Sequence, residues 1–474
     1  MKRPALALLC ASLVAGCSVN REMPPPSIPQ ARAYTAKNEL LSLSQRVTLG
    51  GRIAAQWWTL FASRPLNGLI RTGVAGNYDL AAARETLAQA QEAVTASKGG
   101  LLPQISLGAA AGRQKYGAAL FGPANFTIPP FSYYDVGPSL SWTPDLFGRQ
   151  RYAIERQQAL ADYQSHQLDA AYIALTANIV TETLDLAALN EEIAAARRIQ
   201  ADDEKTLELE KAAYSLGSAS RLDVLGTQTQ LVADSALLPP LEHRRAISRH
   251  ALAILLGKTP AAWSPPDIAL KDFVLPQALP LRLPSELVRQ RPDILAAQDN
   301  LRAAGAAVGE ARTNFYPSIT LTANMMQEAL TPGGIFKNAA NAWSLAAGLS
   351  APISSGGALT AEKRAAQDAY RAALAQYRQT ILNAFAQVAD ALTSLAHDDE
   401  AMAMSRDAVD KARSTYDLTL AGYQSGALGL LQVQGTQRAL ALAELEFMAS
   451  QQQRYLDCVR LFVALGGSPF TGKT

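Results

Sequence analysis

The chain has 474 residues, with 43 Lys and Arg against 41 Asp and Glu and a formal net charge of +2 at pH 7. Because this net charge is close to zero, the chain does not belong to the strongly basic proteins that bind the phosphates of nucleic acids. Because no run of 18 apolar residues occurs after the N-terminal stretch, we expect no membrane-spanning helix in the mature chain.

Residues 1–16 have the pattern of a bacterial signal peptide, with two basic residues ahead of an apolar core. Small residues precede Cys17, as in the lipobox at which a lipoprotein is cleaved and its new N-terminal cysteine is acylated. Acylation would anchor the chain without a spanning helix, and Ser18, by resemblance to enterobacterial lipoproteins, favours sorting to the outer membrane. The alternative is ordinary cleavage beside a chance cysteine. Cys10 would leave with the signal and Cys17 would be lipidated, so Cys458 would have no cysteine with which to form an intramolecular disulfide.

Residues 17–76 are expected to carry the lipid anchor and to form an irregular, proline-containing segment. Trp57, Trp58 and Phe61 would pack this segment against the rest of the molecule, and we favour this role over that of rings that stack on a ligand. The following stretch, Asn77–Gly99, places its apolar residues on one face of a helix.

Four segments then alternate between apolar residues and small or polar ones, as strands with one apolar face do. They are Leu102–Ala110, Val136–Trp142, Ser318–Met325 and Trp343–Ser350. These segments contain no charged residue, and aromatic residues lie near their ends. Both features favour strands that cross a membrane, and the alternative is a soluble sandwich.

Two long helical hairpins are predicted, the clearer one between Gly356 and Gly466. Apolar residues recur there at alternating spacings of four and three, which is typical of a coiled coil. No proline occurs between Pro352 and Pro469. A helix that continued to a break at Gly422 would be roughly 100 Å long at 1.5 Å per residue.

The chain is predicted to contain two copies of one unit. When the sequence is shifted along itself, Tyr214 falls on Tyr423 and Gly217 on Gly426, and no gap is needed from Leu140 to Gly257. Each copy would contain a helix, a strand, a loop, a strand, a long helix, a break and a second long helix. The repeats are predicted at residues 77–257 and 285–466, with an extended linker at 258–284 and a tail at 467–474.

No catalytic pattern is present. The four histidines lie in predicted helices, and the sequence contains no HExxH, CxxC, Walker or GxSxG motif. We therefore expect no enzymatic activity, no metal and no cofactor. Four strands cannot stand alone in a bilayer, where each unpaired backbone group is costly, so we expect the chain to oligomerise.

The sequence resembles the outer-membrane efflux proteins of the TolC/OprM family, and within it the lipoprotein, NodT-type branch. The resemblance rests on the lipobox, the duplication, Arg-Pro-Asp-Ile at 291–294, Ala-Arg and then Phe-Tyr-Pro-Ser-Ile within 311–319, and two Tyr-x-x-Gly helix breaks. It implies a mainly α protein with a membrane β-barrel part. Long coiled-coil hairpins would form the periplasmic α-barrel of a homotrimer, and four strands per chain would contribute to a 12-stranded outer-membrane barrel.

The same resemblance implies a function. Such proteins are exit ducts of tripartite pumps, with a periplasmic adaptor (membrane fusion protein) and an inner-membrane transporter, usually proton-driven and of the RND type. The exported compounds would be small molecules such as drugs or other toxic compounds. Two alternatives are a duct for type I protein secretion and a structural periplasmic coiled-coil lipoprotein, although the latter would need no uncharged alternating strands.

The resemblance also places the functional residues at the hairpin ends. Relatives usually carry Asp at the positions of Gln432 and Gly435, so an acidic ring is missing here. We expect closure by packing of apolar side chains with Arg221–Asp223 as the remaining charged link; the alternative is a constitutively looser channel. The expected gate residues are Tyr423, Leu428, Leu431, Gln432, Arg221 and Asp223, and the expected adaptor contacts are Leu216, Gly217, Ser218, Ser425, Gly426 and Ala427, whose glycines would also end helices.

Overall fold

The computed structural model describes residues 56–117, 129–276 and 284–466, together with Tyr34, 46–49 and 278–281. The expected signal peptide, Cys17 and the C-terminal residues 467–474 lie outside this part of the chain. The described residues divide into two compact units. One contains the described residues within 87–163 and 297–377, and the other contains those within 28–86, 164–296 and 378–474.

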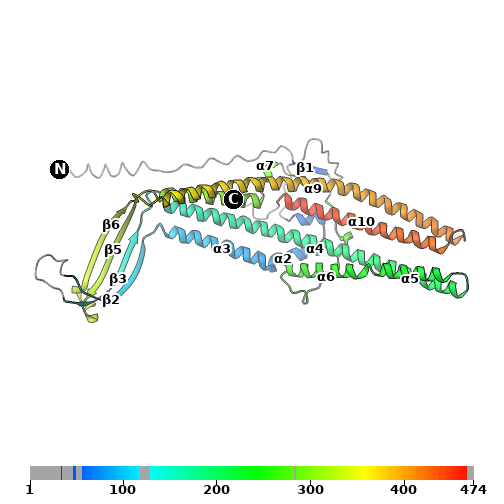
Figure 1. Ribbon diagram of the computed structural model, residues 1–474, viewed down its shortest axis with the longest axis horizontal. Coiled ribbons are helices and arrows are strands. Elements are labelled where there is room, and N and C mark those ends of the chain that lie inside the picture. Colours follow the sequence, from blue (N-terminus) through cyan, green and yellow to red (C-terminus); the bar gives the residue numbers. More distant parts are fainter. Residues whose placement is uncertain are drawn as a thin grey trace. The chain divides into compact units, whose positions relative to one another are not determined.

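The first unit contains a four-stranded antiparallel sheet in the order β2-β3-β5-β6 (Figure 1). The strands are β2 (Gln104–Gln114), β3 (Phe131–Trp142), β5 (Ser318–Ala329) and β6 (Asn341–Ser350). All four predicted segments are therefore strands. The predicted segments themselves hold no charged residue, but the strands continue beyond them, and the paired residues include Arg113, Asp135 and Glu328.

Each repeat has one helix before its strands and one long helix after them. The preceding helices are α3 (Tyr78–Gly99) and α8 (Pro292–Thr313). The long helices are α4 (Arg149–Ser215) and α9 (Ala358–Gln424), both of 67 residues. Their equal length supports the duplication. Within α4, one 18-residue stretch is apolar enough to cross a membrane, but 72% of it is buried inside the protein, as expected of a core helix.

The returning arms of the two hairpins differ. In the second hairpin (α9 and α10) the arm is one helix, α10 (Leu430–Ala464). In the first hairpin (α4, α5 and α6) it is divided into α5 (Arg221–Ser235) and α6 (Leu238–Leu255), so the prediction of a single long helix is wrong there. Pro239 and Pro240 stand in the first turn of α6. Proline lacks an amide hydrogen and is tolerated in a first turn but not in a helix interior, so a new helix begins just before these residues, at Leu238.

The segment before the first repeat packs as expected. It contains the 3₁₀ helix η1 (Trp57–Phe61) and α2 (Arg64–Gly76). The Trp57 ring is fully buried and stacks on Phe462 of α10, with ring centroids 5.5 Å apart. Tyr455 packs against Phe61 and donates a hydrogen bond from its hydroxyl to the Phe273 carbonyl, at 2.9 Å.

The predicted linker is only partly extended. It contains the 3₁₀ helix η3 (Leu270–Asp272) and the short strand β4 (Ala278–Leu281), and α7 (Pro284–Leu287) follows. β4 pairs in parallel with β1 (Arg46–Leu49), which lies in the segment predicted to be irregular. The sequence did not indicate this pairing. Two further 3₁₀ turns, η4 (Pro332–Gly334) and η5 (Asn338–Ala340), lie between β5 and β6.

Candidate functional site

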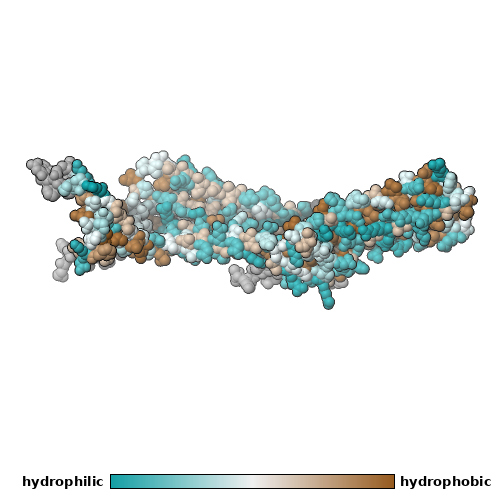
Figure 2. Space-filling view, turned by 90° about the horizontal axis from the view of Figure 1, so that it is seen from below, coloured by the Kyte–Doolittle hydropathy of each residue, from teal (hydrophilic) through white to brown (hydrophobic). Residues whose placement is uncertain are grey.

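The sheet has one apolar face, and strand register creates it. Ile105 of β2 is paired with Leu140 of β3, Leu140 with Ala323 of β5, and Ala323 with Leu345 of β6. Because side chains alternate along a strand, this register collects the apolar positions of all four strands on one side. The apolar side is exposed in the single chain: Ile105 is 74% exposed and Leu345 73%. Figure 2 shows hydrophobic residues gathered over these strands.

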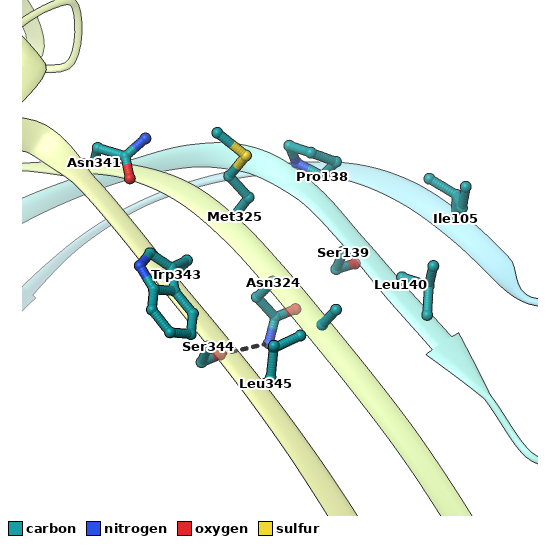
Figure 3. A pocket seen from close by; sticks show the side chains of 11 residues that line it. Ile105, Pro138, Ser139, Leu140, Asn324, Met325, Asn341, Trp343, Ser344 and Leu345 are labelled. Atoms are coloured by element: carbon teal, nitrogen blue, oxygen red, sulfur yellow. Dashed lines mark hydrogen bonds between the residues drawn. The ribbon is translucent and has the colours of Figure 1, made fainter.

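A shallow groove of about 400 Å³ crosses the apolar face of the sheet. Figure 3 shows Trp343 and Leu345 on β6, Met325 on β5, and Pro138 and Leu140 on β3 around it. A large exposed apolar surface marks contact with a membrane or another protein. The groove contains no arrangement of polar groups that would select a ligand, so we regard it as part of a lipid-facing surface.

The opposite face of the sheet is polar. Ser106 and Ser139 are hydrogen-bonded across β2 and β3 at 2.8 Å, and the Asn324 amide donates to the Ser344 hydroxyl at 3.3 Å (Figure 3). Asp135 and Glu328 lie opposite each other on this face by register. Two neighbouring acids require water around them. The two faces therefore suit lipid on one side and an aqueous lumen on the other.

Close approach of β3 and β5 depends on one glycine. A Cβ atom at Gly137 would lie 2.1 Å from the Met325 carbonyl oxygen and 2.8 Å from the Met326 Cα. Both are backbone atoms of the neighbouring strand, so no side-chain rotation could relieve the overlap. Gly108, which is paired with Gly137 across β2 and β3, has nothing within 4 Å of the equivalent position.

The two hairpin turns have the same geometry. Gly217 and Gly426 adopt φ angles of +76° and +77°, in the left-handed region that favours glycine. The Ser218 amide donates to the Ala213 carbonyl and the Ala427 amide to the Gly422 carbonyl, both at 2.9 Å. These are the hydrogen bonds of a Schellman helix end. The glycines at the tips therefore end helices, and an adaptor contact at the same place is compatible with this role.

The helix that follows each turn begins with a side-chain cap. The Asp223 carboxylate accepts a hydrogen bond from the Ser220 amide at 2.7 Å, and the Ser220 hydroxyl accepts one from the Asp223 amide. In the second repeat, the Gln432 side-chain oxygen accepts from the Gly429 amide at 3.0 Å. Gln432 thus makes the same capping contact as Asp223, the matching residue of the first repeat, but without a negative charge.

The expected gate side chains are largely exposed in the single chain. Leu431 is 74% exposed, whereas Tyr423 and Leu428 are close to 40%. Leu216, an expected adaptor contact, is 83% exposed. Leu428 folds back over Gly422, where an added Cβ would lie 2.6 Å from the leucine Cδ1. Exposed apolar side chains that gather at a tip are typical of a surface that contacts another protein. Arg221 makes no ion pair with Asp223 among the described contacts, and the carboxylate instead caps α5.

Comparison with known proteins identifies the family. A family model described as outer membrane efflux protein matches residues 69–258 and 283–467, most of the chain and both repeats. This chain is an outer membrane efflux protein. The family resemblance inferred from the sequence is confirmed, and the protein is localised to the outer membrane. The family consists of channels rather than enzymes.

Similar proteins cover the efflux protein almost from end to end. The toluene efflux pump outer membrane protein TtgF of Pseudomonas putida is 30% identical over 98% of this chain and 97% of its own length. Nodulation protein T of Rhizobium leguminosarum bv. viciae is 28% identical, over 96% and 91%. The solved structure of the outer-membrane channel OprN has 26% identity and a TM-score of 0.84, over 95% of this chain and 99% of that one.

The sequence did not reveal two buried charge clusters of the efflux protein. One lies between α9 and α10, where the Arg454 Nε donates to Asp399 at 2.8 Å and Arg460 pairs with Asp457 at 2.6 Å. The other joins α5 and α10, where Arg438 donates to the buried Asp234 carboxylate at 3.0 Å. The only feature of the sequence that could have indicated these clusters was a charged residue, such as Asp398, at a position of the otherwise apolar coiled-coil stripe. In the described part of the chain, no group of His, Cys, Asp or Glu could hold a metal ion.

Burial and the neighbouring Asp457 raise the pKa of Asp398 to about 7, although Arg454 opposes this. The Asp398 Oδ2 atom is buried without a hydrogen-bond partner, and a proton there would be shared with Asp457. The pKa is higher in the folded than in the unfolded chain. This group therefore contributes stability that is complete below about pH 4 and is lost as pH rises to about 7.

Asp398→Asn should consequently flatten the pH dependence of thermal stability. The wild-type unfolding temperature should fall as pH is raised from about 4 to about 8, and the variant should lose a few degrees less over the same range. Differential scanning fluorimetry of detergent-solubilised protein measures both curves. Asp407→Asn, at an exposed acid of the same helix, is the control and should retain the wild-type slope. Parallel curves for wild type and Asp398→Asn would contradict the assignment.

Proposed function

We propose that this protein is the outer-membrane channel of a tripartite efflux system, formed by three copies of the chain. The sheet is the observation that carries the proposal. It has an exposed apolar face, a polar face, and two edge strands, β2 and β6, that are paired on one side only. An open edge cannot persist in lipid, where backbone groups have no water to bind. Joining β2 of one copy to β6 of the next would remove every edge, and three copies would give a barrel of 12 strands.

The helical hairpins support a periplasmic role. Their tips expose apolar side chains around short glycine-containing turns. We assign adaptor contact to Leu216–Ser218 and Ser425–Ala427, where the small residues would let another protein approach the backbone. An inner-membrane transporter, proton-driven and of the RND type, would supply the energy. The two matched segments of the family model support division into repeats at 77–257 and 285–466.

The proposed cargo is small toxic organic compounds. The name of the relative TtgF refers to toluene efflux, and similarity over the whole chain supports a related cargo class here. The duct itself would be permissive, because selection occurs in the transporter. A lipid anchor at Cys17 is part of the proposal, and the residue lies outside the described part of the chain. Incorporation of labelled palmitate, absent from Cys17→Ser, would test the anchor.

Assembly and conduction test the proposal together. Detergent-solubilised protein should have the mass of a trimer by light scattering, and it should form channels in planar bilayers. A strain lacking the gene should become more sensitive to organic solvents and lipophilic drugs, with normal protein secretion. A stable monomer with a folded sheet would contradict the architecture. Loss of secretion without loss of drug tolerance would instead indicate a type I secretion duct.

A further inference from the structure

The efflux protein has a cavity of about 440 Å³ between α4, α6 and the linker that joins the two repeats. Its lining includes Asn190 from α4, Arg245 and Arg249 from α6, and residues 264–267 of the linker. All of these residues belong to the same compact unit. Because no residue of the hairpin turns or of the sheet lines the cavity, neither the gate nor the membrane surface accounts for it.

Hydrogen bonds hold the walls of this cavity together. The Asn190 side-chain amide donates to the Ile268 carbonyl at 3.2 Å and ties the linker to α4. The Ser248 hydroxyl donates to the Glu182 carboxylate at 2.7 Å and ties α6 to α4. Because the three walls are already fixed to one another, a ligand would not have to order them, which lowers the cost of binding.

Two arginines of the lining have no acidic partner. Arg245 and Arg249 are one turn apart on α6, so their side chains lie on the same face of the helix. In the described part of the chain, neither forms an ion pair with an aspartate or a glutamate. The Arg249 Nε atom is buried without a hydrogen-bond partner, and its Nη2 atom lies 3.3 Å from the Nε2 atom of His250. An anion in the cavity would offset both the repulsion between the two cations and the cost of burying this guanidinium.

The neighbouring arginines, by contrast, are paired. Arg197 of α4 forms an ion pair with Glu242 of α6 at 2.7 Å, and Arg244 of α6 forms one with Glu192 of α4 at 3.7 Å. Glu242 lines the cavity and therefore already has its cation. The remaining acid of the lining is Asp267, which comes from the linker and forms no ion pair among the described residues.

The unpaired groups define the chemistry of a ligand. Arginines bind a carboxylate through parallel hydrogen bonds. The Asp267 carboxylate would accept a hydrogen bond from an ammonium group, and together with Glu242 it would disfavour a dianion such as phosphate. Pro265 and Pro266 add apolar surface beside these charges. A ligand with one carboxylate and one ammonium group close together fits this lining, and an α-amino acid group carries both on a single carbon.

We propose that this cavity binds an α-amino acid group, and that its ligand is the free end of diaminopimelate in the stem peptides of the cell wall. Arg245 and Arg249 would bind the carboxylate, and Asp267 the ammonium group. The inference rests on the proposed periplasmic position of the helices, because a duct that runs through the periplasm must pass the cell wall. Three copies of the site on one trimer would bind a polymer of repeating stem peptides more tightly than a single peptide.

Co-sedimentation of the purified trimer with isolated cell-wall sacculi tests the proposal. The wild type should sediment with sacculi that contain diaminopimelate, and the soluble peptide Ala-Glu-diaminopimelate should compete. Arg249→Gln and Arg245→Gln should each lower the bound fraction several-fold. The matched control is Arg244→Gln, at the paired arginine of the same helix, which should bind as the wild type does.

A second comparison tests the role of Asp267. The wild type should prefer the soluble peptide with a free diaminopimelate amine over the same peptide with that amine acetylated. Asp267→Asn should lose this preference, whereas a merely structural role would leave the ratio of the two affinities unchanged. Sacculi of the lysine type, whose side chain ends in an ammonium group without a carboxylate, should bind the wild type weakly.

The possible results separate the site from the channel. Equal sedimentation of wild type and Arg249→Gln would overturn the proposal, and binding of the soluble peptide without binding of sacculi would overturn the assignment to the cell wall. Dissociation of the trimer in Arg249→Gln would show that a neighbouring copy fills the cavity, which also overturns it. All variants should conduct like the wild type in planar bilayers. Absence of conduction from the wild type would instead overturn the proposed function.

Discussion

Gly137→Ala is expected to abolish assembly, whereas Gly108→Ala should assemble normally. A methyl group at residue 137 would lie 2.1 Å from the Met325 carbonyl oxygen, far inside van der Waals contact, and the atoms it meets belong to the backbone of β5. The strands must separate to admit it. Separation would pull apart the β3–β5 pairs on either side of Gly137, Val136–Gln327 and Ser139–Asn324. Unpaired backbone groups in lipid cost several kcal/mol each.

The control lies directly across the ladder. Gly108 is paired with Gly137 and shares its face of the sheet, but a methyl group there meets nothing within 4 Å. Both substitutions replace a strand glycine with alanine, so both change the intrinsic strand propensity by the same amount. Yield of trimer in outer-membrane fractions, followed by size-exclusion chromatography with light scattering, measures the outcome. Equal trimer yields for the two variants would show that β3 and β5 are not as close in the assembled protein.

Tyr423→Ala combined with Asp223→Ala is expected to raise resting conductance several-fold and to let large antibiotics enter cells. The tips would be closed by apolar side chains, and threefold symmetry would triple each loss. Because Asp223 caps α5, its removal also destabilises the start of that helix. Asp223→Asn should therefore be tested in parallel, since an amide retains the capping oxygen, as Gln432 does in the second repeat.

Two controls test whether the gate lies at the tip of the second hairpin. Tyr214→Ala changes the matching tyrosine of the first repeat and should raise conductance less than Tyr423→Ala. Trivalent cations should block the wild-type pore only weakly, because Gln432 and Gly435 stand where an acidic ring would bind them. Planar-bilayer recordings measure both effects. Tight trivalent block of the wild type, or unchanged conductance in the double variant, would place the constriction elsewhere.

The sequence by itself determined the family, the duplication, and the type of nearly every element. These features are local. The alternation of β5 is contained in about ten residues, and the turn at Gly426 follows from a glycine at a left-handed position. The division of the first returning arm into α5 and α6 also has a local cause, the adjacent prolines Pro239 and Pro240. The duplication concealed it, because the matching positions of the second repeat hold no proline.

Only the tertiary structure showed which strands pair and which helix residues are in contact. The common apolar face depends on a register that joins strands from both repeats, and β1 with β4 join segments far apart in the chain. Arg438 is hydrogen-bonded to Asp234, 204 positions away in the sequence, and no local pattern in either helix predicts this contact. Periodicity tells which face of a helix is buried, but the partner of each polar residue is fixed by how the helices pack. The contact between Arg438 and Asp234, unlike the fold, could therefore not be predicted from the sequence.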